Sequence, residues 1–129
     1  MIGNHIIDSN VIIDFFRNKE NKLIDLMNKE QVSVSVIVVG ELIYGAENSP
    51  QIKKHVNQVE SLLANMIVID IDLDTAKIYA KIRSELKKSG KPIPENDIWI
   101  AATAIKNNLT LITNDRHFDF IKVLKCKEF

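Results

Sequence analysis

The sequence contains little cysteine, glycine or proline, and each shortage argues against a class of protein. Cys126 is the only cysteine among 129 residues, so no disulfide can form within the chain, and a reducing, cytoplasmic setting is expected. Four glycines and three prolines, with no low-complexity stretch, argue against linkers and disorder. Neither a signal peptide nor an apolar run of about 18 residues is present, so no membrane span is expected.

A net charge of one sign is also missing. Seventeen basic and seventeen acidic side chains give a formal net charge of zero, so overall charge does not indicate a nucleic-acid-binding protein. Any such role must depend on where individual charges lie. The length and the hydrophobic share of 46% predict one globular domain, residues 1–129, with a single core.

Short apolar runs typical of strands alternate along the chain with amphipathic segments typical of helices. The expected strands are residues 5–7, 32–36, 66–71, 109–113 and 120–125. The expected helices are residues 11–17, 21–29, 38–46, 50–63, 73–89 and 94–108, with Pro94 in the first turn of the last. This alternation predicts an α/β fold, a three-layer α/β/α sandwich with a mainly parallel central sheet.

Two acidic residues are expected together at one edge of that sheet. Asp8 directly follows the first strand, and Asp115 lies in the turn after the strand at 109–113. The carboxyl ends of parallel strands meet at the same edge, where ligands of such sheets bind. Asp97 lies in the first turn of its helix, at the tip of a buried stripe, and is expected at the same edge.

Glu41 lies one turn into the helix after the second strand. Ile37 and Tyr44 share its side of the helix, and Gly45 leaves space beside the carboxylate. An apolar helix face rarely buries an unpaired carboxylate, so Glu41 is the hardest of the four acids to explain structurally.

The other three acids each have a structural explanation. Asp8 can cap the following helix, Asp97 can interact with a helix dipole, and Asp115 can be a turn residue. Ser9 and Asn10 can hydrogen-bond the carboxylate of Asp8 or the waters around it, or they can cap the helix.

Four carboxylates at one edge repel one another unless one is protonated or a cation lies among them. Oxygen ligands of this kind suit a hard cation such as Mg²⁺. Three scattered histidines and a single thiol do not form a zinc cluster. The chain also lacks a glycine-rich phosphate loop and a G-x-S-x-G nucleophile turn.

Four stretches of the chain resemble the PIN-domain nucleases, in the order that the family shows. They are "IIDSNVIID", "VVGELIYG", "IPENDIWIAATA" and "LITNDRHF", and the resemblance covers essentially the whole chain, from Asp8 to Phe118. The chain is most similar in pattern to the VapC toxins of prokaryotic toxin–antitoxin pairs. The acidic positions of the family correspond to Asp8, Glu41, Asp97 and Asp115, and its polar residue in the last stretch corresponds to Thr113.

The resemblance implies a Mg²⁺- or Mn²⁺-dependent endoribonuclease that forms a homodimer and is inhibited by a small antitoxin protein. Asp8 and Asp97 would hold one or two metal ions, with Glu41 and Asp115 completing the site. Cleavage of the RNA phosphodiester by a metal-activated water would leave 5′-phosphate and 3′-hydroxyl ends. The antitoxin would place a helix in a groove near residues 38–46 and 50–63, and a basic side chain among the acids.

RNA binding requires positive charge away from the acids. Arg116, next to Asp115, is the first candidate for a phosphate contact. Further candidates are Lys81, Arg83, Lys87, Lys88, Lys91, Lys53 and Lys54. For lysines on a helix, a solvated outer face is the commoner role.

His117 and Phe118 are candidates for stacking on RNA bases, although a position in the core is favoured for Phe118. Trp99 could pack inside the domain or form a dimer contact, and packing is favoured.

Other functions remain open at this point. A housekeeping PIN-domain RNA-processing nuclease would show the same acids. A receiver-like phospho-acceptor domain has a similar length and fold, but it requires paired acids after the first strand, where Ser9 and Asn10 follow Asp8. A haloacid-dehalogenase-like phosphatase requires a second acid at position 10. The last alternative is a PIN-like module that only binds RNA or protein, against which four retained acids argue.

Overall fold

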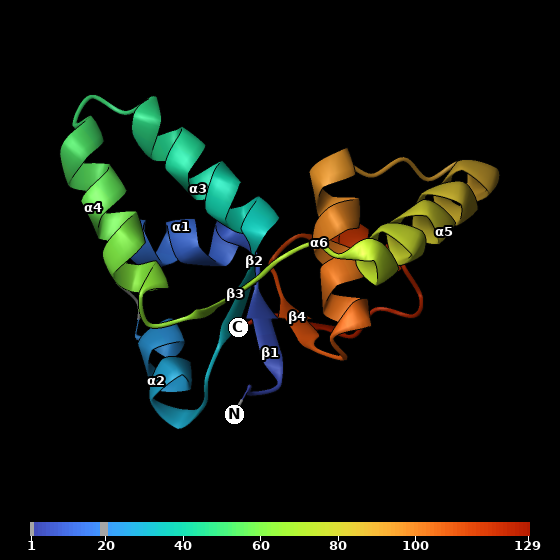
Figure 1. Cartoon of the computed structure of the whole chain (residues 1–129), viewed down its shortest axis with the longest axis horizontal. Coiled ribbons are helices and arrows are strands. Elements are labelled where there is room, and N and C mark those ends of the chain that lie inside the picture. Colours follow the sequence, from blue (N-terminus) through green and yellow to red (C-terminus); the bar gives the residue numbers. More distant parts are fainter. Residues whose placement is uncertain (1, 19–20) are drawn as a thin grey trace.

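In a computed structural model of the chain, the described residues, 2–18 and 21–129, form a five-stranded sheet between two layers of helices (Figure 1). The strands are β1 (His5–Ile7), β2 (Ser33–Ser35), β3 (Ile67–Ile69), β4 (Thr110–Ile112) and β5 (Cys126–Lys127). Their spatial order is β3-β2-β1-β4-β5, and every neighbouring pair is parallel. The predicted α/β/α sandwich with a parallel sheet is therefore confirmed.

The helices divide between the two faces of the sheet. They are α1 (Ser9–Asn18), α2 (Lys22–Lys29), α3 (Val36–Glu47), α4 (Ile52–Leu63), α5 (Leu73–Ser89) and α6 (Glu95–Lys106), followed by the 3₁₀ helix η1 (Arg116–Phe120). Helices α1 to α4 lie to one side and α5 and α6 to the other (Figure 1). Right-handed crossovers explain this division, because the chain first moves from β1 to β3 and then crosses back to β4.

The direction of the chain reverses between β1 and β4, which are neighbours in the centre of the sheet. The connection after β1 leads toward β2, whereas the connection after β4 leads toward β5 on the opposite side. In open parallel sheets, such a reversal opens a crevice beyond the carboxyl ends of the two strands. Asp8 and Thr113 are the first residues beyond those ends.

Complete burial of the central strands explains why they are continuous apolar runs. Ile6 and Ile7 of β1 and Leu111 and Ile112 of β4 have no exposed surface. The fully buried residues of α6 are Ile100, Ala101, Ala102, Thr103 and Ala104. The small side chains of its three alanines let the helix pack closely against the sheet.

Two sequence expectations about element boundaries are wrong. Val36 belongs to α3 rather than to a strand, because the Ser35 hydroxyl accepts a hydrogen bond from Val38 N at 3.1 Å and starts the helix. Pro94 is the cap residue before α6 rather than part of its first turn. Among residues 2–18 and 21–129, no helix has the length and apolar character needed to cross a bilayer.

The strand expected at 120–125 is also wrong. Phe120 ends η1, and Ile121 is buried in the turn that follows, so its apolar character serves packing rather than strand pairing. The edge strand β5 begins only at Cys126 and pairs with Leu111 and Ile112 of β4.

Candidate active site

Asp8 is held rigidly at the carboxyl end of β1. The carboxylate is 4% exposed; its Oδ1 accepts a hydrogen bond from Ser9 N at 2.8 Å, and its Oδ2 accepts one from the Thr113 hydroxyl at 2.7 Å. Burial raises the pKa of Asp8, and these two hydrogen bonds oppose the rise. The strand end therefore presents a fixed carboxylate that binds a proton more readily than an exposed aspartate does.

Thr113 connects Asp8 to the turn after β4. Its hydroxyl oxygen also accepts hydrogen bonds from Asp115 N at 3.1 Å and from Asn10 Nδ2 at 3.4 Å. Asn10 Oδ1 accepts a further bond from Asn114 N at 3.3 Å. Asn10 and Thr113 thus join the beginning of α1 to the loop that carries Asp115, while Ser9 contributes its backbone N–H to Asp8.

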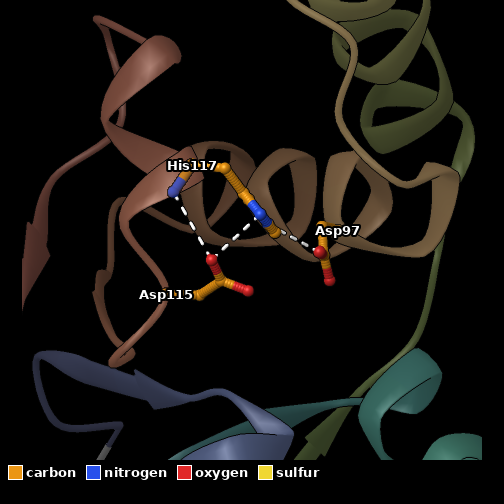
Figure 2. Close-up of side chains that lie close together, drawn as sticks. All are labelled: Asp97, Asp115 and His117. Carbon is orange, nitrogen blue, oxygen red and sulfur yellow. Dashed lines mark hydrogen bonds and ion pairs between the residues drawn. The ribbon is translucent and has the colours of Figure 1, made fainter.

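His117 lies between two of the predicted acids (Figure 2). Its Nε2 is 2.7 Å from Asp97 Oδ2, and its Nδ1 is 2.9 Å from Asp115 Oδ1. Among the described residues no hydrogen bond is assigned to Nε2, so the contact with Asp97 is a close approach of the two side chains, which is an ion pair only when the ring carries a proton. Burial raises the pKa of Asp97, the charge of Asp8 raises it further, and His117 opposes both effects.

Glu41 faces the same cluster from α3. Its Oε1 is buried and has no hydrogen-bond partner among the described residues. Burial raises the pKa of Glu41, and the negative charges of Asp8 and Asp97 raise it further, while Ser9 and Asn96 act in the opposite direction. This carboxylate therefore lacks a neutralising partner within the described part of the chain.

The surroundings of Glu41 agree only in part with the sequence expectation. Tyr44 is 72% exposed, so it does not share a buried face with Glu41. The expected space beside Gly45 is present, because a Cβ added there would meet no atom within 4 Å. Glu41 and Gly45 both line a groove of about 370 Å³ between α1, α3 and α4.

The amino-acid sequence of the chain matches a known protein family. Residues 5–124 match the PIN domain family. The chain belongs to the PIN domain family. The receiver and haloacid-dehalogenase alternatives are therefore wrong.

Relatives of this PIN domain extend over almost its whole length. The ribonuclease VapC2 of Haemophilus influenzae is 31% identical over 128 residues, or 97% of each chain. The tRNA(fMet)-specific endonuclease VapC of Shigella flexneri is 29% identical over 127 residues, or 96% of each chain. The crystal structure of DNA-bound VapBC from Salmonella typhimurium has a TM-score of 0.93 at 30% identity, covering 99% of this chain and 98% of that chain.

The PIN domain brings all four predicted acids together. The charge of Asp115 raises the pKa of both Asp8 and Asp97, and the charges of Asp8 and Asp97 raise the pKa of Glu41, so Asp8 and Asp97 lie within electrostatic reach of both other acids. Arg116 is exposed beside them and makes no recorded ion pair within the described residues. Its contact with RNA stays a prediction.

The donor set of the cluster suits a divalent cation. Asp97, Asp115 and His117 can each offer one ligand atom, all within 4.8 Å of one another. Asp8 is outside this group of three, and Glu41 adds an oxygen without a partner. Carboxylate oxygens are the ligands of Mg²⁺ and Mn²⁺, and an orphaned buried oxygen is what a site for such an ion would present.

The only role that the sequence predicts for His117 is stacking on an RNA base. The structure places it at the centre of the acid cluster, because η1 turns the chain directly after Asp115 and directs the ring toward α6. The one sequence signal was its position two residues after a predicted site acid. That spacing is common in turns and does not show that the ring reaches Asp97.

Proposed function

We propose that this PIN domain is a Mg²⁺-dependent endoribonuclease and the toxin of a toxin–antitoxin pair, with Mn²⁺ as an alternative ion. The single observation that carries the proposal is the convergence of Asp8, Glu41, Asp97 and Asp115 at the crevice between β1 and β4, with Glu41 Oε1 left unpaired. The names of the relatives, which are ribonucleases or endonucleases, support the reaction class.

Each acid has a distinct role in the proposed reaction. Asp8 and Asp97 would hold the ion, and Glu41 and Asp115 would complete the site directly or through waters. A bound divalent cation lowers the pKa of water and stabilises the charge that develops on the phosphoryl group. Glu41, whose carboxylate binds a proton more readily than usual, is suited to take the proton of the attacking water, and Asp115 is the second candidate for that role.

RNA cleavage by the purified protein tests the reaction. End-labelled RNA should be cut in Mg²⁺ or Mn²⁺ and not in EDTA, leaving 5′-phosphate ends. Asp97→Asn should lower the rate by at least about a hundredfold, since it removes a proposed ligand. Asp70→Asn is the matched control, because Asp70 also follows a strand but lies outside the cluster. Cleavage by Asp97→Asn at the wild-type rate would contradict the assignment of Asp97 as a metal ligand of the active site.

The groove between α1, α3 and α4 is the proposed site of the antitoxin. Several structural relatives are VapBC complexes, including the Salmonella typhimurium structure. In this chain the groove has an apolar wall that includes Ile13, Phe16 and Leu42, and Glu41 lines it as well. A helix seated there could place a basic side chain on the orphaned carboxylate oxygen.

The gene neighbourhood and one pair of variants separate a toxin from a housekeeping nuclease. A toxin requires an adjacent reading frame that encodes a short DNA-binding protein, and that product should co-purify with this chain. Gly45→Leu should prevent the co-purification, whereas Gly40→Leu on the exposed side of α3 should not. A nuclease without such a neighbour would favour the housekeeping role.

The homodimer also remains a proposal. Sedimentation of the purified chain at several concentrations measures it directly, and a monomer at high micromolar concentration would contradict it.

A further inference from the structure

A basic surface lies on the C-terminal half of α5 and on the segments that pack against it. Two adjoining hollows there, of about 550 and 220 Å³, share the side chain of Leu86. The charged residues that line them are four basic and one acidic, namely Arg83, Lys87, Lys91, Lys122 and Glu85. In a protein of zero formal net charge, this is a local excess of positive charge.

Three of these cations have no carboxylate partner among residues 2–18 and 21–129. Arg83 is neutralised by Glu95, whose Oε1 is 2.9 Å from Nη1. Lys87, Lys91 and Lys122 take part in none of the ion pairs recorded for the described part of the chain. The dipole of α5 explains a lysine in its last turn, such as Lys87, but it does not explain Lys91 or Lys122, which lie beyond the helix.

An exposed aromatic ring accompanies these lysines. Phe120 is 45% exposed, and Lys91 Nζ lies 5.1 Å from the centre of its ring. Phe120 is three residues after His117 on η1, while Lys91 begins the segment that leads into the first turn of α6, where Asp97 lies. Phe120 and Lys91 therefore belong to the two chain segments that lead to the contact between His117 and Asp97.

We propose that Lys87, Lys91 and Phe120 form a subsite for single-stranded RNA beside the cleavage site, a proposal that rests on the ribonuclease function proposed above. The lysines contact phosphates of the bound strand outside the acid cluster, and a base stacks on the part of the Phe120 ring that Lys91 leaves exposed. Unpaired cations next to an accessible aromatic face are the combination that binds single strands without reading their sequence. The acid cluster itself repels phosphate, so the grip on RNA must come from a neighbouring surface such as this one.

Fluorescence anisotropy with a fluorescein-labelled, random-sequence single-stranded RNA tests the subsite in the Asp97→Asn background with EDTA present, where cleavage of the probe should be negligible. The double change Lys87→Gln and Lys91→Gln should weaken binding about tenfold and reduce the slope of log affinity against log salt by about 1.4. Phe120→Ala should weaken binding about tenfold, and Phe120→Trp should restore it. Lys22→Gln with Lys29→Gln, both exposed on α2, removes the same charge elsewhere and is the matched control.

The outcomes separate the subsite from the ribonuclease function. If the wild type cleaves RNA but the lysine pair on α5 matters no more than the control pair, the subsite is wrong and the function stands. If only the lysines matter and Phe120→Ala binds normally, the surface attracts any polyanion and the nucleotide subsite is wrong. If the wild type never cleaves RNA, yet binding depends on Lys91 and Phe120, the ribonuclease proposal fails and an RNA-binding surface remains. Circular dichroism and the fluorescence of Trp99, the only tryptophan, verify that each variant is folded.

Discussion

Among the clustered acids, Glu41 shows most clearly how a buried carboxylate lowers the stability of the folded protein. Its folded-state pKa is raised, first by burial and then by the charges of Asp8 and Asp97. The folded protein therefore holds this proton more tightly than the unfolded chain does, and the contribution of Glu41 to stability falls as the pH rises from 4.5, the ordinary value for a glutamate, through the raised value. The charged form of this carboxylate therefore destabilises the metal-free fold relative to the protonated form.

The first prediction is that removing the negative charge of Glu41 stabilises the metal-free protein. In EDTA at pH 8, Glu41→Gln should raise the free energy of unfolding by about 0.5–1 kcal/mol, because the neutral amide removes the repulsion. The difference from wild type should shrink as the pH falls toward 4.5. Urea unfolding at several pH values measures it. Glu60→Gln, on the exposed side of α4, is the control and should change little. A destabilised Glu41→Gln at pH 8 would contradict the electrostatic account.

At the scale of elements, the two helices of the second layer are tied together by Asp72. Its Oδ1 accepts hydrogen bonds from Thr75 N at 2.9 Å and from the Thr75 hydroxyl at 2.8 Å, which caps the start of α5. Its Oδ2 lies 2.7 Å from Lys106 Nζ, at the end of α6. The bond from Lys106 is the largest cause that lowers the pKa of Asp72, followed by the bonds from Thr75.

The second prediction separates two contributions of Asp72 to stability, namely the helix cap that it forms on α5 and its negative charge. Because the folded-state pKa of Asp72 is lowered, its contribution to stability is present above the ordinary value of 3.8 and is lost as the pH falls below it. At pH 7, Asp72→Ala should lower Tm by a few degrees, and Asp72→Asn by less, since asparagine still caps the helix. Thermal unfolding at pH 7 and at pH 3 measures both, and the differences from wild type should be smaller at pH 3, where the loss of this contribution has begun. Equal losses for both variants at pH 7 would show that the cap contributes nothing.

The position of Asp8 and Asp115 could be predicted because it depends only on element order. Once strands and helices alternate, the sheet is parallel, and a residue directly after any strand lies at the same edge. His117 could not be predicted in this way, because the direction of its ring depends on the 3₁₀ turn of η1 and on how α6 packs. The strand expected at 120–125 failed for the same reason: Ile121 is apolar because a turn buries it, and a short apolar run does not show which element buries it.

The candidate site belongs to the whole molecule, since its acids come from four elements that are far apart in the sequence. Asp8 follows β1, Glu41 is on α3, Asp97 is on α6 and Asp115 precedes η1. Only the completed sheet, with both helical layers in place, brings them together. An ion held by several of these carboxylates binds the folded chain and not the unfolded one, so it should stabilise the fold as a whole.

The last prediction measures that linkage. Millimolar Mg²⁺ or Mn²⁺ should raise the Tm of the wild-type protein relative to EDTA, since saturation at a hundred times Kd contributes about 2.7 kcal/mol. The double variant Glu41→Gln, Asp97→Asn should begin from a higher Tm in EDTA, because two repelling charges are gone, and should then respond weakly to either ion. Asp70→Asn, a strand-end acid outside the cluster, should respond as wild type does. An equal rise in Tm for the double variant would place the bound ion elsewhere, and an unchanged wild-type Tm would leave the acid cluster without the cation on which the proposed chemistry depends.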